Sequence, residues 1–445
     1  MILDFTIRNY RSYKDETQFT FEALDSEYRS TDVQEVILDS GRKLRLLKTA
    51  IIIGANASGK SNVIWAFFEM ANMVVNSREW RVNQPLNYLP FALDKTMPGK
   101  PTELVLRLIA AGNLYSFKIA YTHSIQEETL SQVMDDDSEQ LVYRVTRDEQ
   151  QKAKLEGGPA WTTKELDLSE TLFLPNHLFI SEISNKPSGN VLEVYQEIAK
   201  MQVLPIDDNI NLTANNAYVA QTILQSEKSD AFKKLQKLIE VSDLGIKGLL
   251  MQRHKDEEFR FPDNIPGNVR NALMEQYRWE FKTAHKGYDE NHQELRVVLD
   301  MGLESVGTKH IFELGARILD VLEKGTVLAY DEMNLAIHPN LFRLLIEMFN
   351  RPEINTKGAQ LMFTSHDVSI IGNEPYFRAD QIWFAEKGDD GQSQLYSAQD
   401  FDDIDINVPF ENWYRAGRFG ALPSPKSLDY IFGINGKENT ENTAE

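Results

Sequence analysis

Residues 48–61 read Lys48-Thr49-Ala50-Ile51-Ile52-Ile53-Gly54-Ala55-Asn56-Ala57-Ser58-Gly59-Lys60-Ser61. The run up to Ile53 is β-branched and apolar without alternation, which is typical of a strand covered on both faces. The last eight residues match G-x-x-x-x-G-K-[ST] at every specified position. Apolar residues then recur at helical spacing through Ser61 to Val75. The stretch therefore predicts a buried strand, a glycine-containing loop and a helix.

This strand, loop and helix are the context in which such a loop binds phosphate. Its glycines let the backbone curl so that successive amides point at phosphate oxygens. Lys60 then reaches the β and γ phosphates, and Ser61 ligates Mg²⁺ at the start of the helix. The alternative is a glycine-rich turn without a ligand, but a chance match has odds on the order of one in a hundred. The predicted nucleotide contacts are Gly54, Asn56, Ala57, Ser58, Gly59, Lys60, Ser61 and Asn62.

Hydrolysis also needs a fixed metal and an oriented water, and the second half of the chain offers groups for both. The apolar strand Thr326–Tyr330 ends in Asp331 and Glu332. We expect Asp331 to hold Mg²⁺ through its water shell and Glu332 to polarise the attacking water. The next apolar strand, Gln360–Thr364, leads to His366. Although a lone histidine after a strand is usually a surface residue, we expect this one beside the acid pair and the γ-phosphate. The predicted catalytic groups are Glu332, His366 and Lys60.

A further candidate is Glu304-Ser305-Val306-Gly307-Thr308, which precedes a helix with an apolar face. Ser305 or Thr308 would cap that helix, and the segment could be no more than a helix start. The functional alternative is that the Ser305 hydroxyl and the Gly307 amide bind the γ-phosphate of a nucleotide held by another subunit. The residues themselves favour neither interpretation.

The composition limits the classes of partner. The chain has 445 residues with 67 acidic and 47 basic side chains, a formal charge of -20. Such a charge opposes nonspecific DNA binding unless Arg42, Lys43, Arg45 and Lys48, or Lys233, Lys234 and Lys237, form a basic lane. The absence of cysteine excludes disulfides and thiolate nucleophiles. The N-terminus alternates like a strand, and the most apolar stretch, Val63–Val75, is too short to span a bilayer, so we expect a cytoplasmic protein without a membrane partner.

The remaining patterns outline the domain organisation. Ile2–Ile7 and Gln18–Phe21 predict a hairpin or meander, with residues 48–53 as a third strand, while Glu103–Leu108 and Tyr115–Tyr121 predict antiparallel strands that extend the same sheet. Residues 126–167 read as a surface excursion, and residues 191–296 read as largely helical, most clearly at 231–241. Acidic residues that follow the last predicted strand, namely Asp402, Asp403 and Asp405, read as a solvated loop.

Taken in order, these segments resemble the ABC-type ATPase head of the SMC/RecF-like class. The resemblance starts with Phe5-x-Ile7-x-Asn9-Tyr10-Arg11-Ser12 and continues through the phosphate loop, Ser305-Val306-Gly307, the acid pair and His366. More narrowly, other segments resemble the stand-alone ATPases of prokaryotic abortive-infection and anti-phage operons: residues 54–62, Ile337-His338-Pro339, Asp380 to Lys387, Leu395-Tyr396-Ser397 and Gly417-Arg418-Phe419-Gly420-Ala421. The similarity covers residues 1–125 and 295–425.

The resemblance implies an α/β fold, a P-loop ATPase head with a mixed central sheet, flanking antiparallel strands and helices, and an inserted mainly helical subdomain. The expected divisions are an N-terminal lobe at 1–125, a variable insertion at 126–295 that is partly strand and then helical, a C-terminal lobe at 296–433 and a disordered tail at 434–445. It also implies a homodimer or higher homo-oligomer around ATP and Mg²⁺, in which Ser305 and Gly307 act in the other subunit. The signature departs from a Leu-Ser-Gly-Gly-Gln form, and the sensor glutamine has only a weak candidate in Gln126.

Some relatives carry a nuclease after the ATPase, but only 79 residues follow His366 in this chain of 445. By resemblance, we expect an ATP-hydrolysing regulator that controls a separate effector from the same operon, a nuclease or a toxin, in anti-phage defence. Two alternatives stay open. One is a DNA-repair ATPase that clamps DNA, which the net charge disfavours, and the other is a nucleotide-dependent scaffold that hydrolyses ATP slowly.

Overall fold

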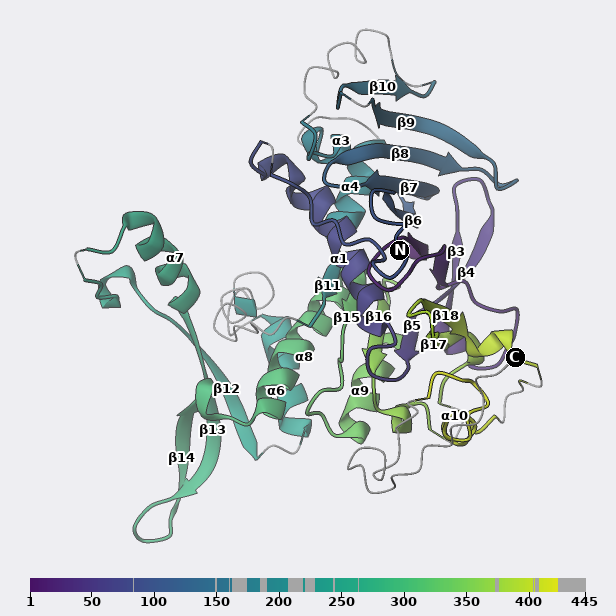
Figure 1. Ribbon diagram of the computed structural model, residues 1–445. Helices are drawn as coiled ribbons and strands as arrows, with labels where there is room; N and C mark the ends of the chain where they lie inside the picture. Colours follow the sequence, from purple (N-terminus) through teal and green to yellow (C-terminus); the bar gives the residue numbers. More distant parts are fainter. Residues whose placement is uncertain are drawn as a thin grey trace, which may run out of the picture.

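The computed structural model describes residues 1–82, 84–148, 150–159, 161, 174–184, 190–206, 219–220, 229–242, 245–262, 264–372, 376–402, 404 and 408–422. Two large sheets lie side by side, and a smaller sheet projects from them (Figure 1). Asp403, Asp405 and the predicted tail at 434–445 lie outside the described residues. Within the described residues, no helix is both long enough and apolar enough to cross a bilayer.

The first large sheet has six strands in the order β11-β15-β16-β5-β17-β18. All neighbours pair in parallel except β17 and β18. The strands are β11 (Gln202–Leu204), β15 (Val327–Tyr330), β16 (Gln360–Ser365), β5 (Thr49–Ile53), β17 (Ile382–Lys387) and β18 (Ser393–Ser397). This arrangement confirms the predicted strand order, because the histidine-bearing β16 lies between the acid-ended β15 and the loop-bearing β5.

Helices cover both faces of this sheet, which explains why β5 is apolar without alternation. Ala50 and Ile52 of β5 face the core that holds α1 (Lys60–Asn76). Ile51 and Ile53 face the core that holds α8 (Val306–Lys324) and α9 (Pro339–Asn350). Each β5 side chain is buried, so every residue of the strand adds apolar area to one core or the other.

The second large sheet is antiparallel, in the order β10-β9-β8-β7-β6-β1-β2. Its strands are β1 (Ile2–Arg8), β2 (Thr17–Thr20), β6 (Thr102–Ala110), β7 (Asn113–Tyr121), β8 (Ile125–Val133), β9 (Glu139–Arg147) and β10 (Ala153–Gly157). The hairpin of β1 and β2 is confirmed. As expected, β6 and β7 extend the sheet of this hairpin, because β6 pairs with β1. The expectation that β5 belongs to the same sheet is wrong, because β5 lies in the six-stranded sheet. The strands β8, β9 and β10 also continue the hairpin's sheet, so the described part of the expected surface excursion supplies strands to it.

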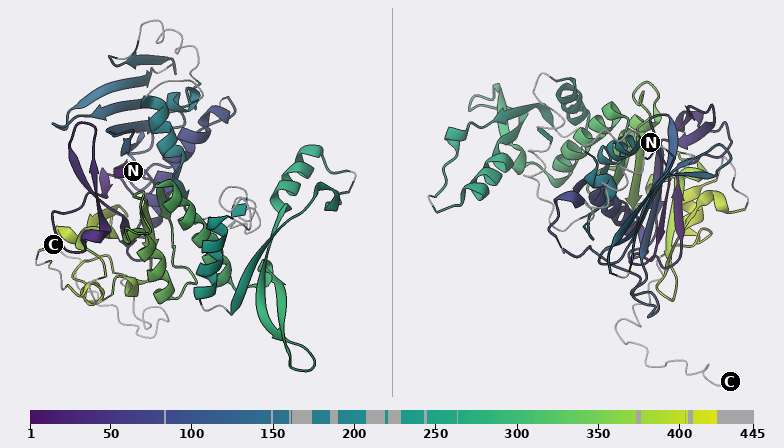
Figure 2. Two further views of the ribbon diagram at one scale, coloured as in Figure 1. Left: turned by 180° about the vertical axis from the view of Figure 1, so that it is seen from behind. Right: turned by 90° about the horizontal axis from the view of Figure 1, so that it is seen from above.

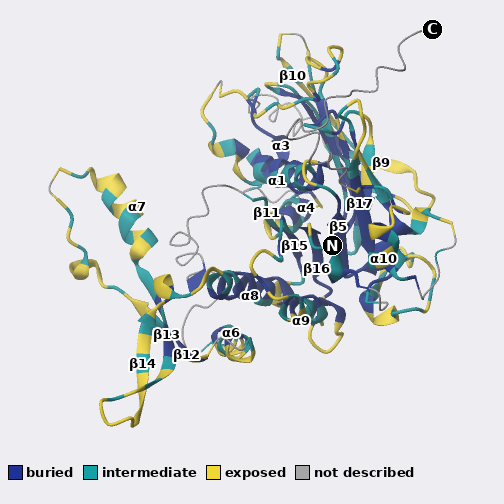
Figure 3. Ribbon diagram, turned by 60° about the horizontal axis from the view of Figure 1, so that its bottom comes forward, coloured by how far each residue is buried: buried dark blue, intermediate teal, exposed yellow. Residues whose placement is uncertain are grey.

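The smaller sheet forms a projecting arm with the strands β12 (Ile246–Arg253), β13 (Trp279–Tyr288) and β14 (Glu294–Asp300). The arm also carries α7 (Gly267–Tyr277), and its base rests on α6 (Asp230–Val241) and α8 (Figures 1 and 2). The structure thus confirms the predicted helix at 231–241 but adds three strands to a segment expected to be largely helical. The outer strand β14 is mostly exposed, whereas β12 and β13 are partly buried (Figure 3) and their buried side chains do not alternate regularly with exposed ones.

The remaining elements are shorter. A two-stranded ribbon consists of β3 (Val33–Ile37) and β4 (Lys43–Leu47). Three helices, α3 (Phe179–Glu182), α4 (Asn190–Ala199) and α10 (Phe410–Arg415), complete the described helices.

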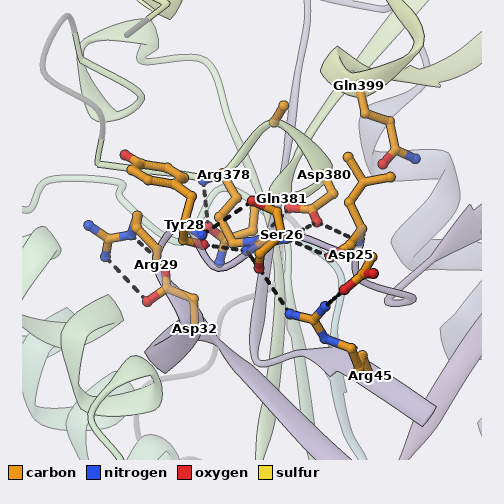
Figure 4. A network of polar contacts seen from close by, with 12 residues as sticks. Asp25, Ser26, Tyr28, Arg29, Asp32, Arg45, Arg378, Asp380, Gln381 and Gln399 are labelled. Atoms are coloured by element: carbon orange, nitrogen blue, oxygen red, sulfur yellow. Dashed lines mark hydrogen bonds and ion pairs between the residues drawn. The ribbon is translucent and has the colours of Figure 1, made fainter. Parts of the chain in front are cut away.

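A buried ion pair joins the two ends of the chain (Figure 4). Arg378 and Asp380, 3% and 1% exposed in their side chains, bond each other next to the start of β17. The Arg378 guanidinium also donates to the carbonyls of Leu24, Ser26 and Tyr28. Because the guanidinium finds acceptors throughout its buried surroundings, it fixes the segment between β2 and β3 against the start of β17.

Candidate functional site

The polar groups singled out in the sequence meet at one edge of the six-stranded sheet. Parallel strands place their carboxyl ends at the same edge, and β5, β16 and β15 are consecutive neighbours there. The loop after β5, the residues after β15 and His366 after β16 are therefore brought together although they come from opposite ends of the chain.

The loop itself is curled by two residues in the left-handed region, Ala57 at φ 60° and Gly59 at φ 111°. A side chain at Gly59 would meet the Ser393 hydroxyl 2.5 Å from its Cβ, so only glycine fits there. Gly54 is equally confined, because a Cβ would overlap the Ala385 carbonyl. Asn56 and Ala57 are exposed at the open side of the loop, while the Ser58 hydroxyl is buried without a hydrogen-bond partner.

Lys60 begins α1 and turns its ammonium back over the loop. Its Nζ donates to the carbonyls of Gly54 at 2.8 Å and Ala55 at 2.9 Å. The residue is 3% exposed, and burial lowers the pKa of Lys60 from its ordinary 10.5 to about 8. The carboxylates of Asp331 and Glu332 act in the opposite direction but are the smaller effect. A buried ammonium held only by carbonyls is well placed to gain from an arriving phosphate.

Asn62, the last predicted contact of the loop, connects α1 with the N-terminal segment. Its amide donates to the Ser12 hydroxyl at 2.7 Å, and its carbonyl oxygen accepts from the Arg11 guanidinium at 3.4 Å. Asn62 therefore helps to hold the N-terminal segment against the start of α1.

The predicted metal ligands lie together. The Ser61 hydroxyl donates to Asp331 Oδ1 at 3.1 Å. Mg²⁺ takes oxygen ligands at 2.0–2.1 Å in an octahedron, so two adjacent ligands lie about 3 Å apart. The hydroxyl and the carboxylate therefore fit a magnesium ion that rests on a bound triphosphate.

Sequence reasoning missed Thr364, which orders this acid pair from the neighbouring strand. The Thr364 hydroxyl donates to Asp331 Oδ1 and accepts the Glu332 amide at 2.8 Å. Glu332 itself stands in the left-handed region, at φ 49°. A polar residue at the end of an otherwise apolar strand was the one available signal.

Glu332 and His366 face each other at the rim of the site. Glu332 Oε1 lies 2.6 Å from His366 Nε2, and their side chains are 28% and 39% exposed. Both groups can be reached by water, which a general base and a γ-phosphate contact require.

Ser305 and Gly307 lie on the same face of the molecule but outside this cluster. Ser305 caps α8, since its hydroxyl accepts the Thr308 amide at 3.1 Å. Gly307 packs on the loop after the acid pair, where a Cβ would lie 2.6 Å from the Ala336 carbonyl. Neither residue lines the cavity at the phosphate loop. Gln126, the weak sensor candidate, bonds within the turn before β8.

An open cavity of about 700 Å³ extends from the phosphate loop. Residues 54–58 and His366 form one side. The end of β17 and the C-terminal segment around α10 form the other, with Glu386, Lys387, Tyr414, Arg415 and Ala421. Sequence reasoning gave no role to this second wall.

The comparison with solved structures found SMC heads. One is an SMC head bound to the C-winged helix domain of ScpA, 13% identical, with a TM-score of 0.41 and coverage of 89% of this chain and 97% of that chain. Another is the SMC head domain from Thermotoga maritima, 11% identical, with a TM-score of 0.38 and coverage of 89% and 98%. A third, derived from Pyrococcus furiosus, is an Smc head with an extended coiled coil bound to the C-terminal domain of ScpA, 14% identical, with a TM-score of 0.38 and coverage of 89% and 96%.

No curated protein matches the sequence. The mixed architecture, with its phosphate loop between β5 and α1, confirms the expected α/β fold. A family model described as "AAA domain, putative AbiEii toxin, Type IV TA system" matches residues 50–372, which include the loop, the acid pair and His366. ATPases of this kind use a nucleotide with Mg²⁺. Because the match covers most of the chain, this protein belongs to that AAA-domain family.

Proposed function

We propose that this protein is an ATP-binding and ATP-hydrolysing regulator that dimerises around Mg-ATP and controls a separate effector protein, a nuclease or a toxin, in anti-phage defence. The observation that carries the proposal is the convergence of Lys60, Ser61, Asp331, Glu332 and His366 at one sheet edge. The family to which the chain belongs supports the link to abortive infection.

The chain's own residues would divide the work as follows. Lys60 places its charge on the phosphates, while Ser61 and Asp331 hold Mg²⁺, which neutralises the developing charge of the transferred phosphoryl group. Glu332 accepts a proton from the attacking water, and His366 contacts the γ-phosphate. The Thr364 hydroxyl holds the carboxylate of Asp331 and the backbone amide of Glu332 in place.

The surface around Ser305 supports a second copy as the partner in this site. Ser305 is exposed at the N-terminus of α8, where amides favour an anion. Large apolar side chains around it are also exposed: Leu303 at 75%, Val306 at 69% and Leu335 at 50%. Exposed apolar residues that flank an anion-binding helix end suit an interface closed by the nucleotide.

DNA is the less favoured partner, and the first of the two candidate basic lanes supports that view, whereas Lys233, Lys234 and Lys237 of the second are exposed on α6. Arg42, Lys43 and Arg45 each pair with an acid, namely Asp137, Glu35 and Asp25. Lys48 is 5% exposed and donates to the carbonyls of Thr31 and Asn350. These cations are therefore poorly placed to release counterions from a phosphate backbone.

Complementation between two inactive variants tests the shared site. Lys60→Ala should remove nucleotide binding, and Ser305→Arg should block the face presented to the other subunit. Each variant should lack ATPase activity as a homodimer, while an equal mixture should recover about a quarter of the wild-type rate, because half the dimers then hold one intact site of two. Glu323→Gln, an exposed acid at the far end of α8, is the control.

Light scattering with and without Mg-ATP measures the oligomeric state. The Glu332→Gln variant should accumulate as the ATP-bound dimer, and its ATP turnover rate should be at least about 100-fold lower than that of the wild type. A mixture that stays inactive while each variant folds would contradict the shared site. Affinity capture from the native host identifies the effector, and binding of duplex DNA near physiological salt would support the DNA-clamp alternative instead.

A further inference from the structure

The end of β17 and the turn at residues 417–421 hold the phosphate loop from behind. The loop's second amide, Ala55 N–H, donates to the Ala421 carbonyl at 3.1 Å. The Tyr414 hydroxyl donates to the same carbonyl at 2.8 Å. The Ala55 amide is thus turned away from the inside of the loop, and the position of residue 421 sets the position of residue 55.

Residue 421 is in turn held by Glu386. The Ala421 amide donates to Glu386 Oε1 at 2.9 Å, and Glu386 Oε2 lies 3.0 Å from the Tyr396 hydroxyl. The single proton of that hydroxyl is shared between Glu386 Oε2 and the Phe419 carbonyl, which lies 2.7 Å away. A hydrogen bond to a charged acceptor is stronger than one between neutral groups, so the bond from the Ala421 amide to the Glu386 carboxylate is the strongest of these contacts.

The turn at residues 417–421 is closely packed against its neighbours. Gly420 has φ 65°, and a Cβ there would lie 2.8 Å from the Tyr396 hydroxyl and 2.9 Å from Glu386 Oε2. Phe419 is 1% exposed and stacks on Phe384 of β17, with ring centroids 4.8 Å apart. Phe384 pairs in register with Ile53, the residue directly before the loop. The aromatic contact therefore anchors the turn to the same strand pair that carries the loop.

We propose that Glu386 is a positioning residue for nucleotide binding, which acts through Ala421 to keep the phosphate loop in the conformation that receives a triphosphate. The proposal rests on the proposed function, since it assigns the ligand of the loop. A negative group at the wall of a phosphate site is otherwise unfavourable, because like charges repel. Here both carboxylate oxygens face Ala421 and Tyr396.

Variants of Glu386 test this role in the full-length protein. Glu386→Ala should weaken binding of Mg-AMP-PNP about tenfold or more, the scale of one charge-assisted hydrogen bond. Glu386→Gln keeps an oxygen for the Ala421 amide and should restore most of the affinity. Glu353→Ala, an exposed acid beyond α9, is the matched control and should bind as the wild type does. Calorimetry measures the affinities.

Hydrogen exchange separates positioning from general stability. In nucleotide-free protein, Glu386→Ala should speed exchange in peptides that cover residues 54–59 while β1 and β6 keep their protection. If Glu386→Ala does not fold, Tyr396→Phe removes the hydroxyl beside the same carboxylate and should produce a smaller change in the same peptides.

Wild-type affinity and exchange in a folded Glu386→Ala protein would overturn the proposal. A wild-type protein without heat on Mg-AMP-PNP addition would overturn the proposed function instead, and the exchange of residues 54–59 would still decide the role of Glu386.

Discussion

The buried ammonium of Lys60 should make nucleotide affinity depend on pH in a defined window. Burial lowers the pKa of Lys60 to about 8 in the nucleotide-free protein, and a bound triphosphate should raise it again. The lysine is then mostly charged at pH 7.5 and mostly neutral at pH 9.5. If only the charged form binds, affinity for Mg-AMP-PNP should fall about 25-fold between these pH values, which is about 2 kcal/mol.

The stability of the nucleotide-free protein should change in the opposite direction. Between the folded pKa near 8 and the ordinary value of 10.5, the unfolded chain holds a proton on Lys60 that the folded protein lacks. Stability therefore rises with pH in this window. Relative to Lys60→Met, the wild-type free energy of unfolding should increase by about 2 kcal/mol from pH 7.5 to pH 9.5.

Calorimetric titrations at pH 7.5, 8.5 and 9.5 measure the affinities, and urea unfolding of the wild type and Lys60→Met measures the stabilities. Lys48→Met is the matched control, since Lys48 is a second buried lysine beside the same sheet that does not line the cavity. This variant should keep the wild-type pH profile of binding. An affinity that is constant from pH 7.5 to 9.5 would refute the assignment of the ammonium to the phosphates.

Three further variants probe single contacts. Thr364→Val, which keeps the shape of the side chain but removes the hydroxyl between Asp331 and Glu332, should lower ATP turnover by about tenfold or more while Mg-free nucleotide binding is unchanged. Asp380→Asn leaves the Arg378 guanidinium buried without its counter-charge, and urea unfolding should show a loss of about 3 kcal/mol. Burial raises the pKa of Glu128 to about 7, so between pH 4.5 and 7 the folded protein holds a proton on Glu128 that the unfolded chain has lost. The free energy of unfolding therefore falls as the pH rises through this range. Relative to Glu128→Gln, the free energy of unfolding of the wild type should decrease by about 2 kcal/mol from pH 5 to 7.5. The expectations would be contradicted by an unchanged ATP turnover in Thr364→Val or an unchanged urea midpoint in Asp380→Asn. The same holds for a difference in unfolding free energy between wild type and Glu128→Gln that does not vary with pH.

The part of the fold that sequence reasoning predicted is the part with strong local patterns. The run from Thr49 to Val74 combines a buried strand, a motif with fixed spacing and an amphipathic helix, so its structure follows from short-range rules. The acid pair and His366 were assigned to one sheet edge because parallel strands have one direction. The strands β12–β14 were missed, since β14 is largely exposed and the buried side chains of β12 and β13 do not follow the alternation that identifies a strand.

The second wall of the cavity was beyond sequence reasoning for a different reason. Ala421 acts through its main-chain carbonyl and amide, and every residue except proline has both of those groups. Gly420 is needed for close contact with Glu386, which lies 34 residues away in sequence. No spacing rule connects such positions, because the link exists only after β17, β18 and the C-terminal turn have packed together.

The residues of the site fall into two groups, those that would contact the nucleotide and those that support the phosphate loop. The residues with recognisable motifs, Lys60, Ser61, Asp331 and Glu332, are those that would meet the ligand directly, and their chemistry dictates their side chains. The groups that shape the loop act through backbone atoms and through one carboxylate, so their identity is set by packing on β17. A variant of Glu386 should therefore alter affinity while leaving the chemical step intact, whereas a variant of Glu332 should alter the chemical step while leaving affinity intact. The contrast between those two acids, which follow or end strands at one edge of the same sheet and have equal size, separates support of the loop from catalysis more cleanly than either variant does by itself.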